Sequence, residues 1–286
     1  MLRSLKSCLV AEGIGTFVLV FLGCGAVHSA VLTGSLTGLW QVGIVWGIAI
    51  MLAIYSVGAI SGAHINPAIT IGLATWNLFP RGRVLPYVAA QLLGAFVAAA
   101  VLYALFGGFV RERESVKKVV RGQPGSEITA MCYGEYFPNP GSLASGDEPY
   151  DAVAHARLNQ NVSELTACLA ELLGTLILGL VVAAVTDERN PLGPQRLAPL
   201  FIGLTVTALI CVLAPLTQAC FNPARDFGPR LFAYFAGWGS IAIPGPRGLG
   251  FLTVYIVSPI VGATLGIGLF QKVLRPAMVA DAAGSA

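Results

Sequence analysis

Two stretches of the chain decide its fold: Ser61-Gly62-Ala63-His64-Ile65-Asn66-Pro67-Ala68 and Gln218-Ala219-Cys220-Phe221-Asn222-Pro223-Ala224. Both lie in apolar sequence and both contain Asn-Pro-Ala. Asparagine is a preferred N-cap, and proline is favoured at the first helical position, where its missing N–H would have no partner. The apolar segments that follow, 66–77 and 222–236, are too short to cross a bilayer. Each motif therefore predicts a re-entrant half-helix.

The rest of the composition is that of a membrane protein. Of 286 residues, 56% are hydrophobic and only 11% are charged, which is too little polar surface to cover a soluble domain of this size. Six segments are apolar over about the 20 residues that span a bilayer core: 8–30, 39–60, 84–106, 165–186, 197–214 and 250–269. The first lacks a clear cleavage site and more spans follow it, so we interpret it as a retained helix. The predicted fold class is an all-α membrane protein with six transmembrane helices and two re-entrant half-helices.

The two halves of the chain repeat one another. Ala11-Glu12-Gly13-Ile14-Gly15-Thr16 recurs as Ala170-Glu171-Leu172-Leu173-Gly174-Thr175, at a similar distance before each Asn-Pro-Ala. Each half holds three spans, an odd number, so the second half must be inverted in the membrane. We expect one channel domain over 1–286, with repeats over roughly 8–106 and 165–272 and a long extracellular loop over roughly 107–162.

The paired motifs predict a pore. Because the two loops enter from opposite faces, the half-helix N-termini meet near mid-bilayer, where their partial positive charges disfavour cations and protons. The pore motifs are Asn66, Pro67, Ala68, Asn222, Pro223 and Ala224, and each asparagine amide can donate to a passing hydroxyl. Non-helical backbone occurs at this depth only where it is buried in protein or lines a water-filled cavity. We therefore expect a ladder of carbonyl acceptors from Gly62, Ala63, His64, Ile65, Gln218, Cys220 and Phe221.

Few charged residues lie inside the apolar segments, and each of them is expected to have a structural or functional role. Arg225 follows Asn222 by three residues, and an intramembrane arginine is costly and usually functional. Asp226 beside it suggests an anchored cluster. Glu12 and Glu171 are placed symmetrically, which favours carboxylates that accept hydrogen bonds from the loop of their own half; a proton relay is the alternative.

Charge and cysteine content exclude several classes of protein. The 17 basic and 14 acidic residues are dispersed, so no nucleic-acid surface is indicated, and the six cysteines show neither CxxC spacing nor companion histidines. We expect no metal, no cofactor and no enzymatic activity. The basic residues of the short connections lie on one side if both termini are cytoplasmic: Arg3, Lys6, Arg81, Arg83, Arg189, Arg196, Lys272 and Arg275.

The paired boxes, the repeated Ala-Glu-x-x-Gly-Thr and Asn222-Pro223-Ala224-Arg225-Asp226-Phe227-Gly228-Pro229-Arg230 resemble the aquaporin superfamily of major intrinsic proteins, and in particular bacterial glycerol uptake facilitators and aquaglyceroporins. The resemblance covers nearly the whole chain, including Phe137-Pro138-Asn139-Pro140. It implies a multi-pass protein of the cell (inner) membrane that forms a homotetramer with one pore in each protomer. Asp226 after the pore arginine is typical of the members that conduct glycerol.

In glycerol facilitators the narrowest point resembles a slot made of Trp, Gly, Phe and Arg. Trp46 and Arg225 match two corners, whereas Ile210 and Ala219 stand at the Gly and Phe positions, a set that is similar to plant nodulin-like channels. Tyr255 also departs from the facilitators, which carry proline there. Phe221 either supplies the missing aromatic surface or packs against lipid or another helix.

The resulting hypothesis is a passive channel for glycerol and other small neutral solutes, with some permeability to water and with membrane lipid around it. A water-selective channel and a channel for urea or hydroxylated metalloids are alternatives. An ion-coupled secondary transporter is a third, because inverted repeats and broken helices occur there too. A transporter requires a titratable residue at its midplane site, and the candidates here are asparagines and the permanently charged Arg225.

Overall fold

The computed structural model describes residues 4–278, so Arg3, which contributes to the predicted orientation, lies outside the described residues. Six helical segments are long and apolar enough to cross a membrane, and no strand occurs in 4–278. Five of the six segments contain one long helix each: α1 Leu5–His28, α2 Leu39–Ser61, α4 Val84–Val116, α8 Glu164–Thr186 and α9 Ala198–Thr217. The sixth joins α11 (Gly250–Leu252), a π-helical segment (Thr253–Val257) and α12 (Ser258–Leu269). The predicted six spans are confirmed.

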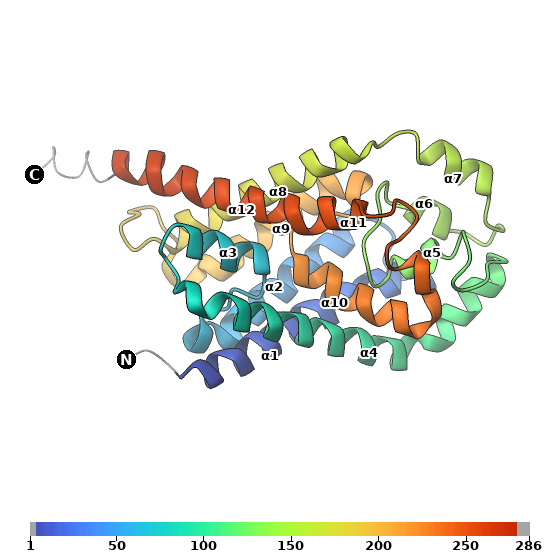
Figure 1. Cartoon of the computed structure of the whole chain (residues 1–286), viewed down its shortest axis with the longest axis horizontal. Coiled ribbons are helices and arrows are strands. Elements are labelled where there is room, and N and C mark those ends of the chain that lie inside the picture. Colours follow the sequence, from blue (N-terminus) through green and yellow to red (C-terminus); the bar gives the residue numbers. More distant parts are fainter. Residues whose placement is uncertain (1–3, 279–286) are drawn as a thin grey trace, which may run out of the picture.

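Two short helices begin at the Asn-Pro-Ala motifs. They are α3 (Pro67–Thr75) and α10 (Pro223–Ala233), and in each the preceding asparagine is the N-cap and the proline is the first helical residue. Figure 1 shows them at opposite ends of the molecule, with α3 near the start of α1 and α10 toward the other end. The predicted half-helices are therefore present, and they approach each other head to head.

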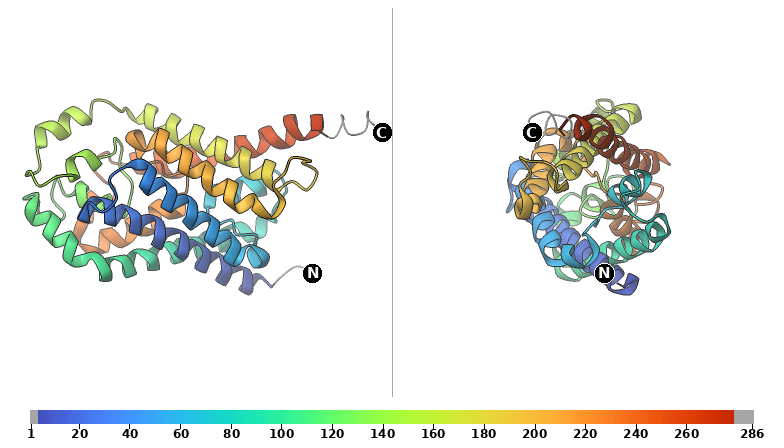
Figure 2. Two further views of the ribbon diagram at one scale, coloured as in Figure 1. Left: turned by 180° about the vertical axis from the view of Figure 1, so that it is seen from behind. Right: turned by 90° about the vertical axis from the view of Figure 1, so that its left-hand side faces the viewer.

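The packing of the helices follows the internal repeat. In the first half α1 packs against α2 and α4, and in the second half α8 packs against α9 and α12. Each half-helix crosses to the other half, since α3 packs on α12 and α10 packs on α4. Viewed along the long axis of the molecule, the helices form a ring (Figure 2). The two re-entrant loops are thereby brought to the centre of that ring.

Helix α4 runs ten residues beyond the apolar segment that ends at residue 106. The extension carries the charged sequence Arg111-Glu112-Arg113-Glu114, which ends the hydrophobic run but consists of good helix formers. Hydropathy marks where the apolar run ends, whereas helix propensity lets the same helix continue outward.

The connection after α4 is folded against the body of the protein. It contains α5 (Glu127–Ala130), α6 (Gly141–Ala144) and α7 (Ala152–Leu158), and residues 125–138 are all buried. These helices cap the end of the molecule opposite the start of α1 (Figure 1). This segment, expected as a long extracellular loop, is an ordered lid over that end of the molecule.

Candidate pore

The first re-entrant loop is held by a buried glutamate of α1. Glu12 Oε1 accepts from the backbone N–H of His64 at 2.9 Å, and Oε2 accepts from that of Ile65 at 2.7 Å. Ile65 has a φ of 44°, in the left-handed region that non-glycine residues avoid. The carboxylate thus satisfies backbone donors that have no helical partner and stabilises a strained turn.

The second loop repeats this arrangement. Glu171 of α8 accepts from the backbone N–H groups of Cys220 at 3.0 Å and Phe221 at 2.8 Å, and Phe221 has a φ of 54°. Thr217 adds a hydroxyl donor to the same carboxylate at 2.6 Å. Both glutamates are fully buried and bonded to the loop of their own half. This geometry is that of a brace and not of a relay between the halves.

The glycines of the repeated motif receive the side chains that precede each asparagine. A Cβ at Gly174 would lie 2.1 Å from a ring carbon of Phe221, and one at Gly15 would lie 2.8 Å from Ile65 Cγ2. The ring of Phe221 is therefore turned against α8, and only 1% of the residue is exposed. Phe221 packs against a helix and does not offer an aromatic surface to the pore.

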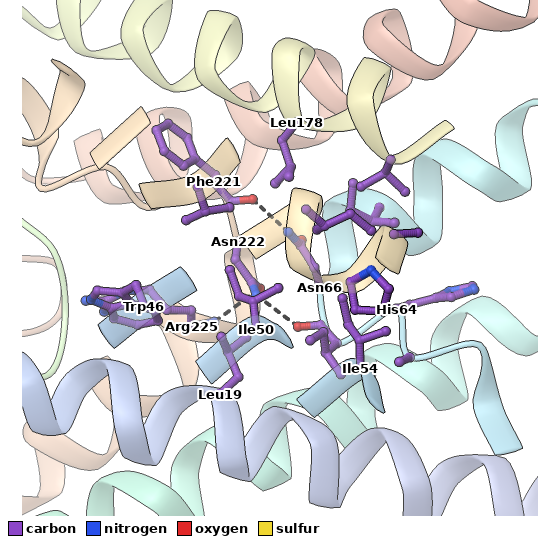
Figure 3. Close-up of a pocket in the computed structure, with 18 of the residues that line it drawn as sticks. Leu19, Trp46, Ile50, Ile54, His64, Asn66, Leu178, Phe221, Asn222 and Arg225 are labelled. Carbon is purple, nitrogen blue, oxygen red and sulfur yellow. Dashed lines mark hydrogen bonds between the residues drawn. The ribbon is translucent and has the colours of Figure 1, made fainter. Parts of the chain in front are cut away.

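The two asparagines meet and bind across the halves. Asn66 Nδ2 donates to the carbonyl of Phe221 at 2.8 Å, and Asn222 Nδ2 donates to the carbonyl of Ile65 at 2.9 Å (Figure 3). Each Oδ1 caps its own half-helix by accepting from the backbone N–H of Ala68 or Ala224. An amide NH2 group has two hydrogens, so each asparagine keeps one for a solute.

An inner cavity of about 260 Å³ runs past the two loops. Most residues expected to form the carbonyl ladder border it: Gly62, Ala63, His64, Ile65, Cys220 and Phe221. Pro67, Ala68, Pro223 and Ala224 do not border it, because they are buried as the first turns of α3 and α10. Apolar side chains form much of the remaining wall: Leu19, Ile50, Ile54, Leu178, Val182, Ile202 and Val206. The cavity therefore combines a polar strip, formed by the two loops and their asparagines, with an apolar wall.

An outer cavity of about 630 Å³ lies on the far side of Arg225, under the lid formed by the third loop. Gln218 borders this outer cavity and not the inner one. Trp46, Ile210 and Arg225 border both cavities, so these three side chains stand where the two meet. Ala219 borders only the inner cavity. Three of the four expected filter residues thus mark one level of the pore, with the fourth just inside it.

Arg225 is buried at this level, and two of its guanidinium nitrogens are bonded to the third loop. Its Cζ lies 4.7 Å from the centre of the Trp46 ring, and its Nη1 donates to the carbonyl of Tyr133 at 3.0 Å. Nη2 pairs with Glu135 Oε1 at 2.5 Å. Tyr133 and Glu135 belong to the third loop, so that loop positions the guanidinium where the two cavities meet.

Glu135 is a site residue that the sequence analysis did not identify. It is 2% exposed, and burial raises its pKa to about 8 although Arg225 acts in the opposite direction. The only signal was its position two residues before Phe137-Pro138-Asn139-Pro140 in a segment that hydropathy assigns to the outside. The fold turns this segment inward.

Asp226 joins the third loop to α10. Its Oδ1 accepts from the backbone N–H of Glu135 at 2.7 Å, and both carboxylate oxygens bind Arg230, at 2.8 and 2.9 Å. Arg230 also donates to the carbonyl of Glu135. Asp226 thus braces the loop that carries the counterion of Arg225.

Comparison with known protein families assigns the chain independently of this geometry. The model of the major intrinsic proteins matches residues 2–270. The chain belongs to the major intrinsic protein family. It is thus a multi-pass membrane protein, and the aquaporin fold predicted for it is confirmed.

Relatives within the major intrinsic protein family are similar over nearly their whole length. The glycerol uptake facilitator protein of Haemophilus influenzae is 39% identical over 95% of both chains. The propanediol uptake facilitator of Citrobacter freundii is 41% identical over 95% of this chain and 93% of its own. The X-ray structure of the aquaglyceroporin from Plasmodium falciparum superposes with a TM-score of 0.78 at 27% identity, covering 96% of this chain and 99% of that one.

Proposed function

We propose that this chain is a passive channel, not an enzyme, that conducts glycerol and other small neutral solutes together with some water. The observation that carries the proposal is the level at which Trp46, Ile210 and Arg225 separate two cavities. There a solute meets the guanidinium donors of Arg225 and, next to them, the apolar ring of Trp46. A polyol presents both kinds of surface, with hydroxyls along one edge and carbons along the other. The named relatives support the same class of solute.

The polar strip beyond the filter supports transfer without a coupled ion. Hydroxyl groups can pass from the guanidinium of Arg225 to the amides of Asn222 and Asn66 and then to the loop carbonyls. Cations are opposed by Arg225 and by the two half-helix N-termini. Among the described residues, no carboxylate borders the inner cavity, which disfavours a cation-coupled transporter.

The proposal extends to topology and assembly. Both termini lie in the cytoplasm, the third loop lies outside, and four copies of the chain form a homotetramer in the cell (inner) membrane with one pore each. The basic residues of the short connections support this orientation. The apolar side chains exposed on the outer faces of the spans, such as Leu93, Leu173 and Val212, support contact with lipid or with other copies.

The decisive experiment is transport in reconstituted liposomes. Proteoliposomes and protein-free liposomes are mixed with a hyperosmotic external solution of glycerol. Light scattering follows their shrinkage as water leaves and their reswelling as glycerol enters. We expect fast reswelling that does not saturate and does not depend on a proton or sodium gradient. Shrinkage without accelerated reswelling would indicate a water-selective channel, and dependence on an ion gradient would indicate a transporter.

A second solute class is favoured by the filter itself. Ile210 adds an apolar side chain beside Trp46, and Ala219 leaves space just inside. Diols with a methyl group match this surface better than a fully hydroxylated triol does, and one relative is named for propanediol uptake. The liposome assay therefore compares 1,2-propanediol, glycerol and urea. Equal rates for all three would show that the filter does not sort solutes by their apolar surface.

A further inference from the structure

The indole of Trp46 lies directly on a glycine of α1. A Cβ built at Gly23 would fall 2.3 to 2.5 Å from three adjacent ring carbons, Cε3, Cζ3 and Cδ2. Near-equal distances to three neighbouring ring atoms place this point over the face of the ring and not at its edge. The hydrogen of Gly23 thus allows the indole to lie flat against the backbone of α1.

A methyl group at this position would displace the ring. Carbon atoms attract optimally at about 3.5–4.0 Å, so the indole would have to move by roughly 1 Å. The side away from α1 is the pore, because Trp46 borders both cavities. The ring would also meet the guanidinium of Arg225, which lies 4.7 Å from its centre. A ring displaced from α1 therefore narrows the passage at the level where the two cavities meet.

This glycine is not part of the repeated framework. The spacing that relates Glu12 to Glu171 relates Gly23 to Val182, a larger residue that lines the apolar wall of the inner cavity. Gly15 and Gly174, in contrast, occur in both halves and accommodate the loop residues before the asparagines. The repeated glycines brace the loops, whereas Gly23 occurs only in the half that carries Trp46.

We propose that Gly23 is a specificity-determining position, which sets the aperture of the filter by seating the indole of Trp46. The inference rests on the proposed function, because it assumes that neutral solutes pass beside Trp46. Gly23 contacts no solute and acts through the indole alone. Its role is therefore separable from the general stability of α1.

The test compares Gly23→Ala with Gly25→Ala in the liposome assay. Gly25 lies two residues further along α1, and a Cβ there would make an ordinary contact of 3.5 Å with Leu102. We expect Gly23→Ala to lower glycerol permeability by about tenfold and water permeability by much less, because the wider solute is more sensitive to the aperture. Gly25→Ala should keep the wild-type ratio of glycerol to water permeability.

A Trp46→Leu background removes the ring carbons that the new methyl group would meet. In that background, addition of Gly23→Ala should leave the permeability ratio unchanged. If Gly23→Ala alone does not fold, the double variant should fold, and failure of both would overturn the proposal. An unchanged ratio in Gly23→Ala would also overturn it while leaving the proposed function intact. Absence of glycerol transport in the wild type would instead refute the proposed function.

Discussion

Arg225 keeps its charge inside the protein because the third loop surrounds it with acceptors. A buried charge is tolerated only when its donors find acceptors, and here oxygens of the Glu135 carboxyl group and the Tyr133 carbonyl contact the guanidinium directly. Asp226 and Arg230 hold the same loop in place from α10. The position of the Arg225 guanidinium therefore depends on the third loop, which Asp226 and Arg230 hold in place.

The charge of Glu135 should make permeability depend on pH. Burial raises its pKa to about 8, so the carboxyl is largely protonated at pH 6 and ionised at pH 9.5. Protonation of Glu135 weakens its ion pair with Arg225. Nη2 of Arg225 then becomes available to bind solutes. We expect the wild type to match Glu135→Gln at pH 6 and to diverge from it at pH 9.5, in glycerol and water permeability measured on liposomes. A wild type that parallels Glu135→Gln at both pH values would refute this role.

The two unusual filter residues should set the ranking of solutes. Replacing Ala219 by Phe and Ile210 by Gly restores the slot seen in glycerol facilitators, with an aromatic wall and more space opposite it. We expect the ratio of glycerol to water permeability to change by several-fold, about 1 kcal/mol of differential interaction. The measurement is paired light scattering with and without glycerol. An unchanged ratio would mean that the constriction lies at a different level.

At the scale of elements, the two half-helices depend on side chains of the spans that face them. Neither α3, with nine residues, nor α10, with eleven, is long enough to be stable as an isolated helix. Their entering loops are strained, and each is bonded to a glutamate of α1 or α8. The spans thus act as the template on which the loops are formed.

Replacement of Glu171, which binds the second loop, should lower the stability of the fold more than it alters the pore lining. In Glu171→Gln, the amide NH2 group would face the N–H donor of either Cys220 or Phe221, so at least one buried donor loses its partner. We expect a loss of about 1–3 kcal/mol, seen as a lower thermal unfolding midpoint in detergent. Glu188→Gln, at an exposed position beyond the end of the same helix, is the matched control. Equal midpoints for the two variants would argue against bracing.

At the scale of the whole molecule, inversion of the second half brings two distant motifs together. Asn66 and Asn222 are far apart in the chain, yet each donates to the carbonyl that precedes the other. These hydrogen bonds join the two halves at the centre of the protein, and the inner cavity runs past them to the level of Arg225, where the outer cavity begins. The outer end of this passage is not built by the repeat alone, because Tyr133 and Glu135 of the third loop bind Arg225 there.

The proposed orientation predicts which loops an impermeant reagent can reach. A cysteine at Asp147, whose side chain is 91% exposed in the third loop, should react with a membrane-impermeant maleimide in intact cells. A cysteine at Arg189, in the connection between α8 and α9, should react only after the membrane is permeabilised. The opposite pattern would invert the orientation, and labelling at both positions in intact cells would refute the topology.

The sequence alone determined the architecture, because hydropathy, helix capping and the repeat are local signals or can be found by comparing the chain with itself. Six spans, two half-helices and the roles of Asn66 and Asn222 as helix caps required no knowledge of tertiary contacts. The role of Glu12 and Glu171 could also be predicted, because their equivalent positions in the two repeats favoured carboxylates that bind the loop of their own half.

Only the tertiary structure decided how the filter is built. Glu135 and Tyr133 lie in a segment that hydropathy places outside, and only the folding of the third loop brings them to Arg225. The packing of Phe221 on Gly174, and of Trp46 on Gly23, depends on which faces of the helices meet. Local sequence specifies where a helix begins and how polar it is, but side chains distant in the chain become neighbours only when the spans pack.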